Sequence, residues 1–210
     1  MKKLFKFALW VAVLGVAAYA AARAFLVDFV HVTHNDMAPT LAQDDLFVLY
    51  RHATPELGDI VVCDHPNHPA GPIAGRLVGL PGDRLAIRRG FLVRNGRQLD
   101  TDVPTPAKIR LNDRARSREF DLRRRREFLD DDVWAVAYQD TRQPLEMQER
   151  RIREGLFLLA DNRSWGTDSR HLGEFEAASC RGVAIYLLTT GTGNGDLDAL
   201  ADERSFNPLR

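Results

Sequence analysis

The most hydrophobic stretch of the chain lies at its N-terminus. Phe7–Ala22 carries no charged residue, and apolar residues resume after Arg23. A helix needs about 20 apolar residues to cross the hydrocarbon core of a bilayer, and an arginine near its end can extend to the interface. The pattern predicts a membrane-spanning helix over residues 7–27, preceded by a basic segment, residues 1–6. The small residues Ala20–Ala22 also fit a signal-peptide cleavage site, but the apolar run is long for a signal peptide.

Lysines precede this apolar segment, at Lys2, Lys3 and Lys6. Positively charged residues beside a membrane helix tend to remain in the cytoplasm. We therefore expect a single-pass protein of the cytoplasmic (inner) membrane that contacts lipid through its helix. Its N-terminus would lie in the cytoplasm and the bulk of the chain in the periplasm or outside the cell.

Beyond the helix, the hydrophobic pattern is typical of β-strands. Short runs rich in Val, Ile, Leu and Phe alternate with Pro and Gly, namely LFVLYR, DIVVCDH, RLVGL, RLAIR, FLVRNG and GLFLLAD. Phe91–Arg94 and Arg97–Leu99 flank an Asn-Gly pair, which predicts a β-hairpin. A last strand is expected at Gly182–Leu188. The Gly-rich, polar segment that follows, residues 191–210, is expected to be a mobile tail.

Two blocks of opposite charge lie between the strand-rich parts of the chain. Lys108–Arg126 holds nine basic and three acidic residues, a net charge of +6, and Glu127–Glu149 holds one basic and seven acidic residues, a net charge of −6. We expect a variable charged lobe, residues 104–149, in which the two blocks pair with each other. Alternatively, Arg123–Arg126 binds anionic lipid or a partner protein. The predicted β core is then residues 28–103 and 150–190.

Composition limits the chemistry that the chain can perform. The 29 basic and 29 acidic residues balance, so global charge does not indicate a nucleic-acid partner. Lys108 is the only lysine beyond the N-terminal segment, and Ser117 is the first serine. A serine nucleophile in the N-terminal half is therefore excluded. Cys63 and Cys180 can form a disulfide, but we favour two small buried strand residues.

Three sequence motifs follow one another along the chain, Asn35–Leu41, Gly75–Arg84 and Ala160–Arg170. They contain Met-x-Pro-Thr-Leu, then Val-Gly-Leu-Pro-Gly-Asp, then Asp-Asn-Arg followed by Asp-Ser-Arg. In this order behind an N-terminal anchor, they resemble bacterial type I signal peptidase of the S26 family over about residues 1–188. The resemblance implies a mainly β fold: an antiparallel signal-peptidase-type core with a variable inserted lobe. It also implies an extended polypeptide as the ligand and no cofactor.

In that family a serine attacks a peptide carbonyl and a neutral lysine takes its proton. A second serine completes the oxyanion hole, and a third orients the lysine. The matching positions here hold Asp36 for the nucleophile, Gly75 for the base, His34 for the oxyanion serine and Gly166 for the orienting serine. The resemblance therefore implies a catalytically degenerate member. The scaffold and binding-cleft positions that still match are Met37, Pro39, Thr40, Arg76, Gly79, Pro81, Gly82, Asp83, Asp161, Asn162, Arg163, Asp168, Ser169 and Arg170.

Other residues offer weak substitutes for the missing groups. Acyl transfer to Asp36 would produce an anhydride, and Arg76 stays protonated and cannot act as a base. An active signal peptidase that uses unconventional residues is the alternative interpretation. Histidines near Asp36 and in a Pro-rich loop lack the repeated spacing of metal ligands, so we expect no metal site among His31, His34, His65 and His68.

The predicted function is therefore a membrane-anchored, non-catalytic homologue that binds exported or surface polypeptides in extended form by strand addition. Analogy alone suggests an accessory role in secretion or in pilus-like surface-structure assembly. The replacement of lysine by Gly75 is expected to open room beside Asp36 for a small or basic group of the partner. A third possibility is a scaffold that binds another membrane protein through its helix or through Arg123–Arg126.

Overall fold

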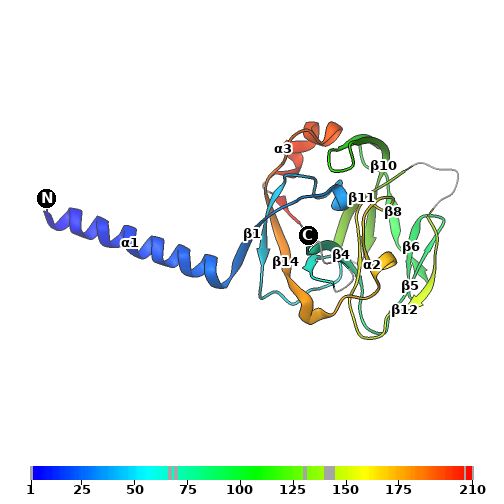
Figure 1. Cartoon of the computed structure of the whole chain (residues 1–210), viewed down its shortest axis with the longest axis horizontal. Helices are drawn as coiled ribbons and strands as arrows, with labels where there is room; N and C mark the ends of the chain where they lie inside the picture. Colours follow the sequence, from blue (N-terminus) through cyan, green and yellow to red (C-terminus); the bar gives the residue numbers. More distant parts are fainter. Residues whose placement is uncertain are drawn as a thin grey trace.

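The computed structural model describes residues 2–65, 68, 71–129, 132–139, 145–205 and 207–209. Helix α1, Lys2–Phe25, projects from a body built of β-strands (Figure 1). Within it, Lys3–Ala21 is long and apolar enough to cross a membrane, with a mean hydropathy of 1.9, and none of this span is buried. The predicted helix is thus present. Its orientation in a membrane stays a prediction.

The largest sheet holds seven antiparallel strands in the order β1-β2-β14-β3-β4-β13, with β15 paired to β14. Most of them coincide with the hydrophobic runs of the sequence. A core of Met37, Leu41, Phe47, Leu49 and Ile60 packs against this sheet. The strands are β1 Val27–His31, β2 Leu46–Tyr50, β3 Ile60–Cys63, β4 Ile73–Gly79, β13 Phe157–Leu159, β14 Cys180–Thr189 and β15 Asn207–Pro208.

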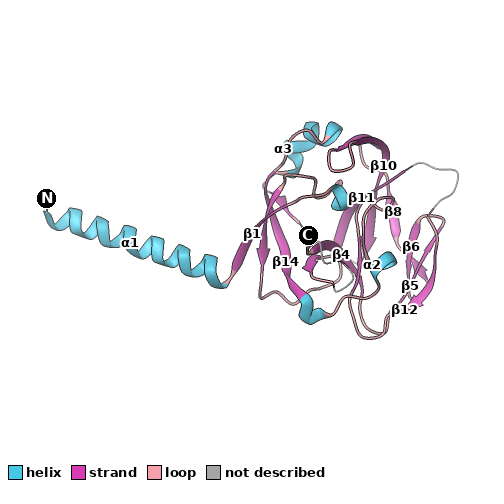
Figure 2. Ribbon diagram, in the orientation of Figure 1, coloured by secondary structure: helices cyan, strands magenta, loops and turns pink. Residues whose placement is uncertain are grey.

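Two four-stranded sheets complete the body, and Figure 2 shows them beside the largest sheet. One has the order β12-β5-β6-β7, and its β6–β7 pair is the hairpin that Asn95 and Gly96 predict, both with positive φ. Its strands are β5 Arg84–Arg88, β6 Phe91–Arg94, β7 Arg97–Gln98 and β12 Met147–Arg151. In the other four-stranded sheet, β10 pairs with β8, β9 and β11. The strands of this sheet are β8 Asp100–Asp102, β9 Lys108–Asp113, β10 Arg118–Leu129 and β11 Asp132–Gln139. The mainly β, antiparallel fold is confirmed.

Short helices connect these strands. They are η1 Asn35–Met37, α2 Ser169–Leu172, η2 Ala177–Ser179, η3 Gly195–Leu200 and α3 Ala201–Arg204. Two of them, η1 and α2, begin within the first and third sequence motifs. Both motifs therefore mark places where the chain leaves a strand.

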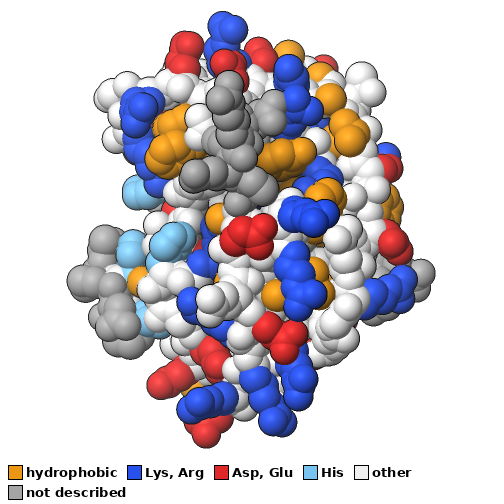
Figure 3. Space-filling model, turned by 90° about the vertical axis from the view of Figure 1, so that its right-hand side faces the viewer, with side chains coloured by type: hydrophobic (Ala, Val, Ile, Leu, Met, Phe, Trp, Pro, Cys, Tyr) orange, Lys and Arg blue, Asp and Glu red, His pale blue; other side chains and the backbone are white. Residues whose placement is uncertain are grey.

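The pairing expected between the two charged blocks is seen in part, because Arg125 contacts Glu127 at 3.0 Å, while Asp130, Asp131 and Asp140 of the acidic block lie outside the described residues. β10 and β11 do form an antiparallel pair, so the blocks lie side by side. Several arginines of the basic block instead form ion pairs with carboxylates outside the acidic block, residues 127–149, as Arg126 does with Asp102. On the face opposite α1, basic and acidic side chains are interspersed (Figure 3). The strand β10, which carries Arg123–Arg126, lies away from α1 (Figure 1).

The C-terminal segment is folded, which corrects the prediction of a mobile tail over residues 191–210. Leu197 and Leu200 of this segment are buried in a cluster with Ile109 and Leu111 of β9. Arg204 forms a largely buried ion pair with Asp45. The leucines that anchor the segment are widely spaced among Gly, Asp and Asn, so its sequence pattern is that of a loop.

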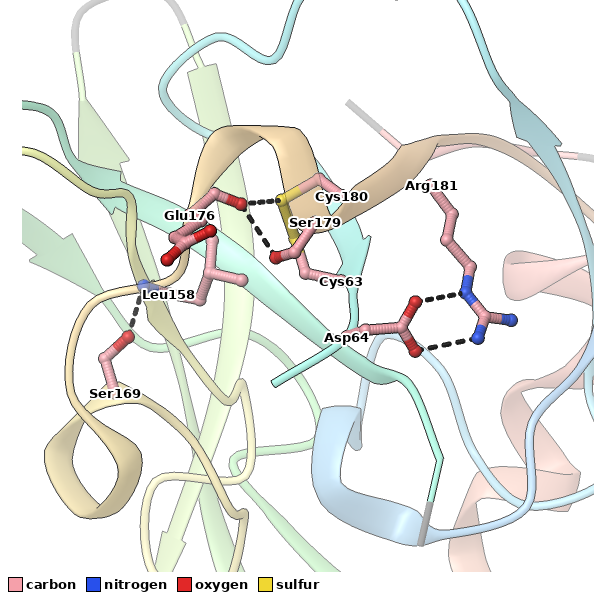
Figure 4. The surroundings of a disulfide bond; sticks show 8 residues. All are labelled: Cys63, Asp64, Leu158, Ser169, Glu176, Ser179, Cys180 and Arg181. Carbon is pink, nitrogen blue, oxygen red and sulfur yellow. Dashed lines mark hydrogen bonds and ion pairs between the residues drawn. A yellow bond between two sulfur atoms is a disulfide. The ribbon is translucent and has the colours of Figure 1, made fainter. Parts of the chain in front are cut away.

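Cys63 and Cys180 form a disulfide, which corrects the expectation of two unpaired thiols. The bond joins β3 to β14, whose register places the two cysteines opposite each other. Next to it, Asp64 accepts two hydrogen bonds from Arg181, at 2.8 and 2.7 Å (Figure 4). The pairing escaped the sequence analysis because strands 117 residues apart become neighbours only in the folded sheet.

Candidate binding cleft

A cleft of about 490 Å³ lies between the chain that leads from β1 into η1 and the start of β4. Its walls are mostly apolar and include Val30, Val32, Phe47, Val62 and Ile73. Its polar lining comes from Asp36, Arg116, Thr167 and the three histidines His31, His34 and His68. The cleft thus contains two of the four positions at which the resemblance places catalytic side chains, Asp36 and His34.

Asp36 lies in the single turn of η1 and is held by two other segments. One carboxylate oxygen, Oδ1, is 3.1 Å from Nη2 of Arg116, and the other accepts a hydrogen bond from the Thr167 backbone N–H at 3.2 Å. The Asp36 carbonyl accepts from the Asn162 backbone N–H at 3.0 Å. The carboxylate is therefore ion-paired and oriented, while its side chain keeps 19% of its surface exposed.

Arg116 is the charged residue of the cleft that the sequence analysis missed. It lies in the turn between β9 and β10 and donates to Asp113 at 2.6 Å as well as to Asp36. Burial lowers the pKa of Arg116, but its hydrogen bonds with Asp113 and Asp36 outweigh burial and raise that pKa. Arg116 lies 80 residues from Asp36, in a lobe that shares no motif with it, so no local signal pointed to the pair.

Gly75, at the position of the family's lysine, is closely packed. A Cβ atom at Gly75 would lie 2.9 Å from Cβ of Leu158 on β13. That distance is shorter than carbon atoms tolerate, and the obstacle is the root of a side chain rather than its mobile end. The expectation of open room beside Asp36 is thus wrong at this position, because Leu158 fills the space.

Gly166, at the position of the lysine-orienting serine, is packed even more tightly. A Cβ atom there would overlap Cβ of Ala160 and would lie 2.9 Å from the carbonyl oxygens of Asn162 and Asp36. A serine at this position requires movement of the backbone or of Ala160. His34, by contrast, is exposed and precedes η1 without capping it.

Scaffold residues of all three motifs meet at a buried ion pair. Arg76 donates to Asp161 through Nε at 2.9 Å and through Nη2 at 2.7 Å, and its Nη1 donates to the Gly58 carbonyl at 2.6 Å. The Thr40 hydroxyl donates to the same carboxylate at 2.5 Å. This pair is buried and fully hydrogen-bonded, which is the condition under which a buried charge pair is tolerated.

The third motif is held by Asp168. Its carboxylate accepts hydrogen bonds from the Ala160 and Arg170 backbone N–H groups and from the Arg170 side chain. Burial raises the pKa of Asp168, but hydrogen bonds from His171, Arg170 and Ala160 outweigh it and lower the pKa to about 2. Next to it, the Ser169 hydroxyl accepts from the Leu158 N–H at 2.9 Å. These contacts fix the chain that passes over Gly166.

The remaining predicted scaffold residues lie in the same frame. Asp83 binds Arg94 and Asn95 and accepts from the Leu80 N–H at 2.9 Å. Burial raises its pKa, but these hydrogen bonds outweigh burial and lower it. Other contacts involve Met37 in the core, Pro39 after a cis peptide bond, Gly79 against Leu85, Pro81 and Gly82 in the turn before Asp83, Asn162 bound to the Asn35 carbonyl, and Arg163 paired with Glu127.

The start of β4 offers a place for an added strand. β13 pairs with β4 only from Arg76 to Gly79, whereas β3 pairs with it from Ile73 onward. Leu77 exchanges hydrogen bonds with the β3 side. Along a strand, the backbone N–H and C=O groups of successive residues point to alternate sides. Because Leu77 points toward β3, Ala74, three residues earlier, points its backbone groups away from β3, and it lines the cleft.

The structure also places the lysine and the possible metal ligands that the sequence offered. Lys108 begins β9, and Asp113, which binds Arg116, ends it. Lys108 therefore lies about 17 Å along the strand from the part of β9 that is next to the cleft. Within the described ranges, no three His, Cys, Asp or Glu side chains are grouped closely enough to share a metal ion.

Comparisons with known proteins agree on one family. The family model described as signal peptidase, peptidase S26, matches residues 4–188 of the chain. A signal peptidase I of Bacillus caldolyticus is 27% identical over 169 residues, which cover 78% of this chain and 80% of the relative. A signal peptidase I of Streptococcus pneumoniae serotype 4 is 28% identical over 177 residues, with coverages of 80% and 85%. A solved signal peptidase I from Enterococcus faecalis V583 is 26% identical, covers 62% of this chain and 97% of its own, and has a TM-score of 0.37.

Proposed function

The chain belongs to the signal peptidase family, peptidase S26, and we propose that it binds exported polypeptides in this cleft without cleaving them. The observation that carries the proposal is the packing over Gly75 and Gly166. A serine–lysine mechanism needs side chains at both positions, and Leu158 and Ala160 occupy the space they would need. The residue at the nucleophile position, Asp36, is an ion-paired carboxylate.

An Asp36 nucleophile would also meet a chemical obstacle. After its carboxylate attacks a peptide carbonyl, the tetrahedral intermediate would have to expel the amine and leave an anhydride, but the carboxylate is the far better leaving group, so the intermediate reverts to the intact peptide. Water activated by a base is the other route, but both carboxylate oxygens of Asp36 already accept hydrogen bonds, from Arg116 and from the Thr167 N–H. The described residues that line the cleft include no Ser, Cys or Lys, so none of them supplies the serine or the lysine of the family's mechanism.

Binding without hydrolysis uses the parts of the cleft that remain. Ala74 lines the cleft at the start of β4, where β13 does not pair with this strand, and its backbone can pair with an extended chain. The apolar walls can take side chains that alternate along that chain. With α1 as an anchor, the cleft lies within reach of polypeptides as they emerge from the membrane. By analogy, the bound polypeptide is a secreted protein or a subunit of a pilus-like surface structure.

Photocrosslinking tests the binding function. A photoreactive amino acid in place of Thr33, which is exposed and lines the cleft, should capture an exported polypeptide in intact cells. The matched control is the same replacement of Arg97, whose side chain is 82% exposed on β7. Mass spectrometry of the captured chain should find its signal sequence or its pro-segment uncut.

Two results would contradict the proposal. Equal capture from Thr33 and Arg97 would show that the cleft has no ligand. Capture of chains that end at a cleavage site within the cleft would favour the alternative, an active signal peptidase. The observation that favours this alternative is that the similar proteins of Bacillus caldolyticus and Streptococcus pneumoniae are signal peptidases I.

A further inference from the structure

The polar end of the cleft carries an unbalanced charge. Asp36 and Asp113 both bind Arg116, so two carboxylates share one guanidinium. Among the described residues that line the cleft, Arg116 is the only Lys or Arg. The group therefore keeps one net negative charge beside apolar walls, where the attraction of a cation is stronger than in water.

The two carboxylates are not equivalent. Asp113 is nearly buried and binds Arg116 twice, through the guanidinium at 2.6 Å and through the backbone N–H at 3.0 Å. Asp36 receives one hydrogen bond from Arg116, at 3.1 Å, and stays partly exposed. If Asp36 releases Arg116, the guanidinium remains neutralised by Asp113. Asp36 is thus the carboxylate that an incoming cation can reach.

We propose that the cleft selects polypeptides that place a Lys or Arg side chain against Asp36, with apolar residues on either side. This inference rests on the proposed function and specifies its ligand. In the empty cleft the guanidinium of Arg116 takes the place of the ligand's cation. When a ligand binds, Asp36 exchanges Arg116 for the ammonium or guanidinium group of the ligand. The Val30, Val32 and Ile73 side chains contact the flanking apolar residues.

Matched peptides test this selection on the full-length protein in detergent micelles. One fluorescent peptide has alternating Ala and Val with a single central Lys, and its partner has norleucine at that position. We expect the Lys peptide to bind about tenfold more tightly, as charge-assisted hydrogen bonds do. Acetylation of the lysine and high salt should each remove most of the difference.

Variants separate the two roles in the pair. Asp36→Asn should abolish the preference for Lys, whereas Asp36→Glu should retain it. Arg116→Gln should increase affinity for the Lys peptide, because the internal competitor is gone. The control Asp121→Asn, whose side chain is 91% exposed on β10, should change neither affinity.

The outcomes distinguish this inference from the proposed function. Equal affinity for the two peptides in the unmodified protein, or tighter binding of the norleucine peptide, overturns the selection of a cation and leaves polypeptide binding intact. Failure of both peptides and of the Thr33 crosslink overturns polypeptide binding itself. Weaker binding of the Lys peptide to Arg116→Gln overturns the role of Arg116 as a competitor.

Discussion

Two aspartate–arginine pairs in this molecule differ in almost every physical respect. Asp161 and Arg76 are buried, make two hydrogen bonds with each other and join the first, second and third motifs. Asp36 and Arg116 are partly exposed, make one hydrogen bond and join the first motif to the charged lobe. The first pair joins the motifs that resemble the family, and the second lies at the position that the resemblance assigns to the nucleophile. Under the proposed function, the frame is kept while the cleft has different chemistry.

The neighbourhood of each pair supports the same contrast. The frame carboxylates Asp161, Asp168 and Asp83 all have several hydrogen-bond donors, so they act as fixed structural charges. At the positions that the resemblance assigns to the base and to its orienting residue, Gly75 and Gly166 are closely packed. Under the proposed function, a serine–lysine mechanism would therefore require changes in the packing as well as at the four positions.

Loss of the buried frame pair should have the largest effect. Asp161→Ala leaves Arg76 buried without its carboxylate, which should lower the free energy of unfolding by about 3–5 kcal/mol. Denaturant unfolding of the full-length chain measures this loss. The control Asp100→Ala, at a side chain that is 78% exposed, should cost less than about 0.5 kcal/mol. Similar values for the two variants would contradict the distinction between frame and surface pairs.

Acid should weaken the frame through Asp168. Its folded-state pKa of about 2 lies below the ordinary value of 3.8, so the ionised carboxylate stabilises the fold above that ordinary value. This stabilisation, roughly 2 kcal/mol, should disappear as the pH falls from about 4 to about 2. Unfolding free energies across this range should show a step that Asp168→Asn removes. A step that persists in this variant would assign the acid sensitivity to other groups.

Restoring a serine in the cleft should destabilise the chain. Gly166→Ser forces a Cβ against Ala160, and overpacking of this kind costs about 1–3 kcal/mol. Ala160→Gly combined with Gly166→Ser should recover a large part of the loss, because the second change removes the clashing methyl group. Thermal unfolding of both variants makes the comparison. A neutral single variant would mean that the cleft is less closed than its packing indicates.

The smallest effect on stability should come from the cleft pair itself. Asp36→Asn removes a partly exposed ion pair and leaves Arg116 bound to Asp113, so the free energy of unfolding should change by less than about 1 kcal/mol. High salt should reduce that change further. A loss as large as that of Asp161→Ala would make Asp36 part of the frame.

The sequence was sufficient to predict the strands of the core and the frame residues. Hydrophobic runs such as Leu46–Tyr50 alternate with turns, and Asn95-Gly96 fixes a hairpin locally. The frame residues could be identified because their motifs are contiguous in the sequence. These features depend on neighbours along the chain, which a sequence displays directly.

The features that escaped prediction all depend on contacts between distant segments. Arg116 reaches Asp36 from a turn in the charged lobe. Leu197 and Leu200 fold the C-terminal segment onto β9, although their neighbours are typical of a loop. Leu158 closes the space at Gly75 from a different strand. The sequence shows that Gly75 lacks a side chain, but it does not show that Leu158 fills the space beside Gly75.

The central claim, a cleft that binds without cutting, is tested most directly by incubating the purified full-length chain with a preprotein that carries an Ala-x-Ala cleavage site. Mass spectrometry should find the preprotein intact after prolonged incubation, while an active signal peptidase I processes it in parallel. A product cut after the second alanine, absent when Asp36→Ala replaces the unmodified chain, would contradict the account.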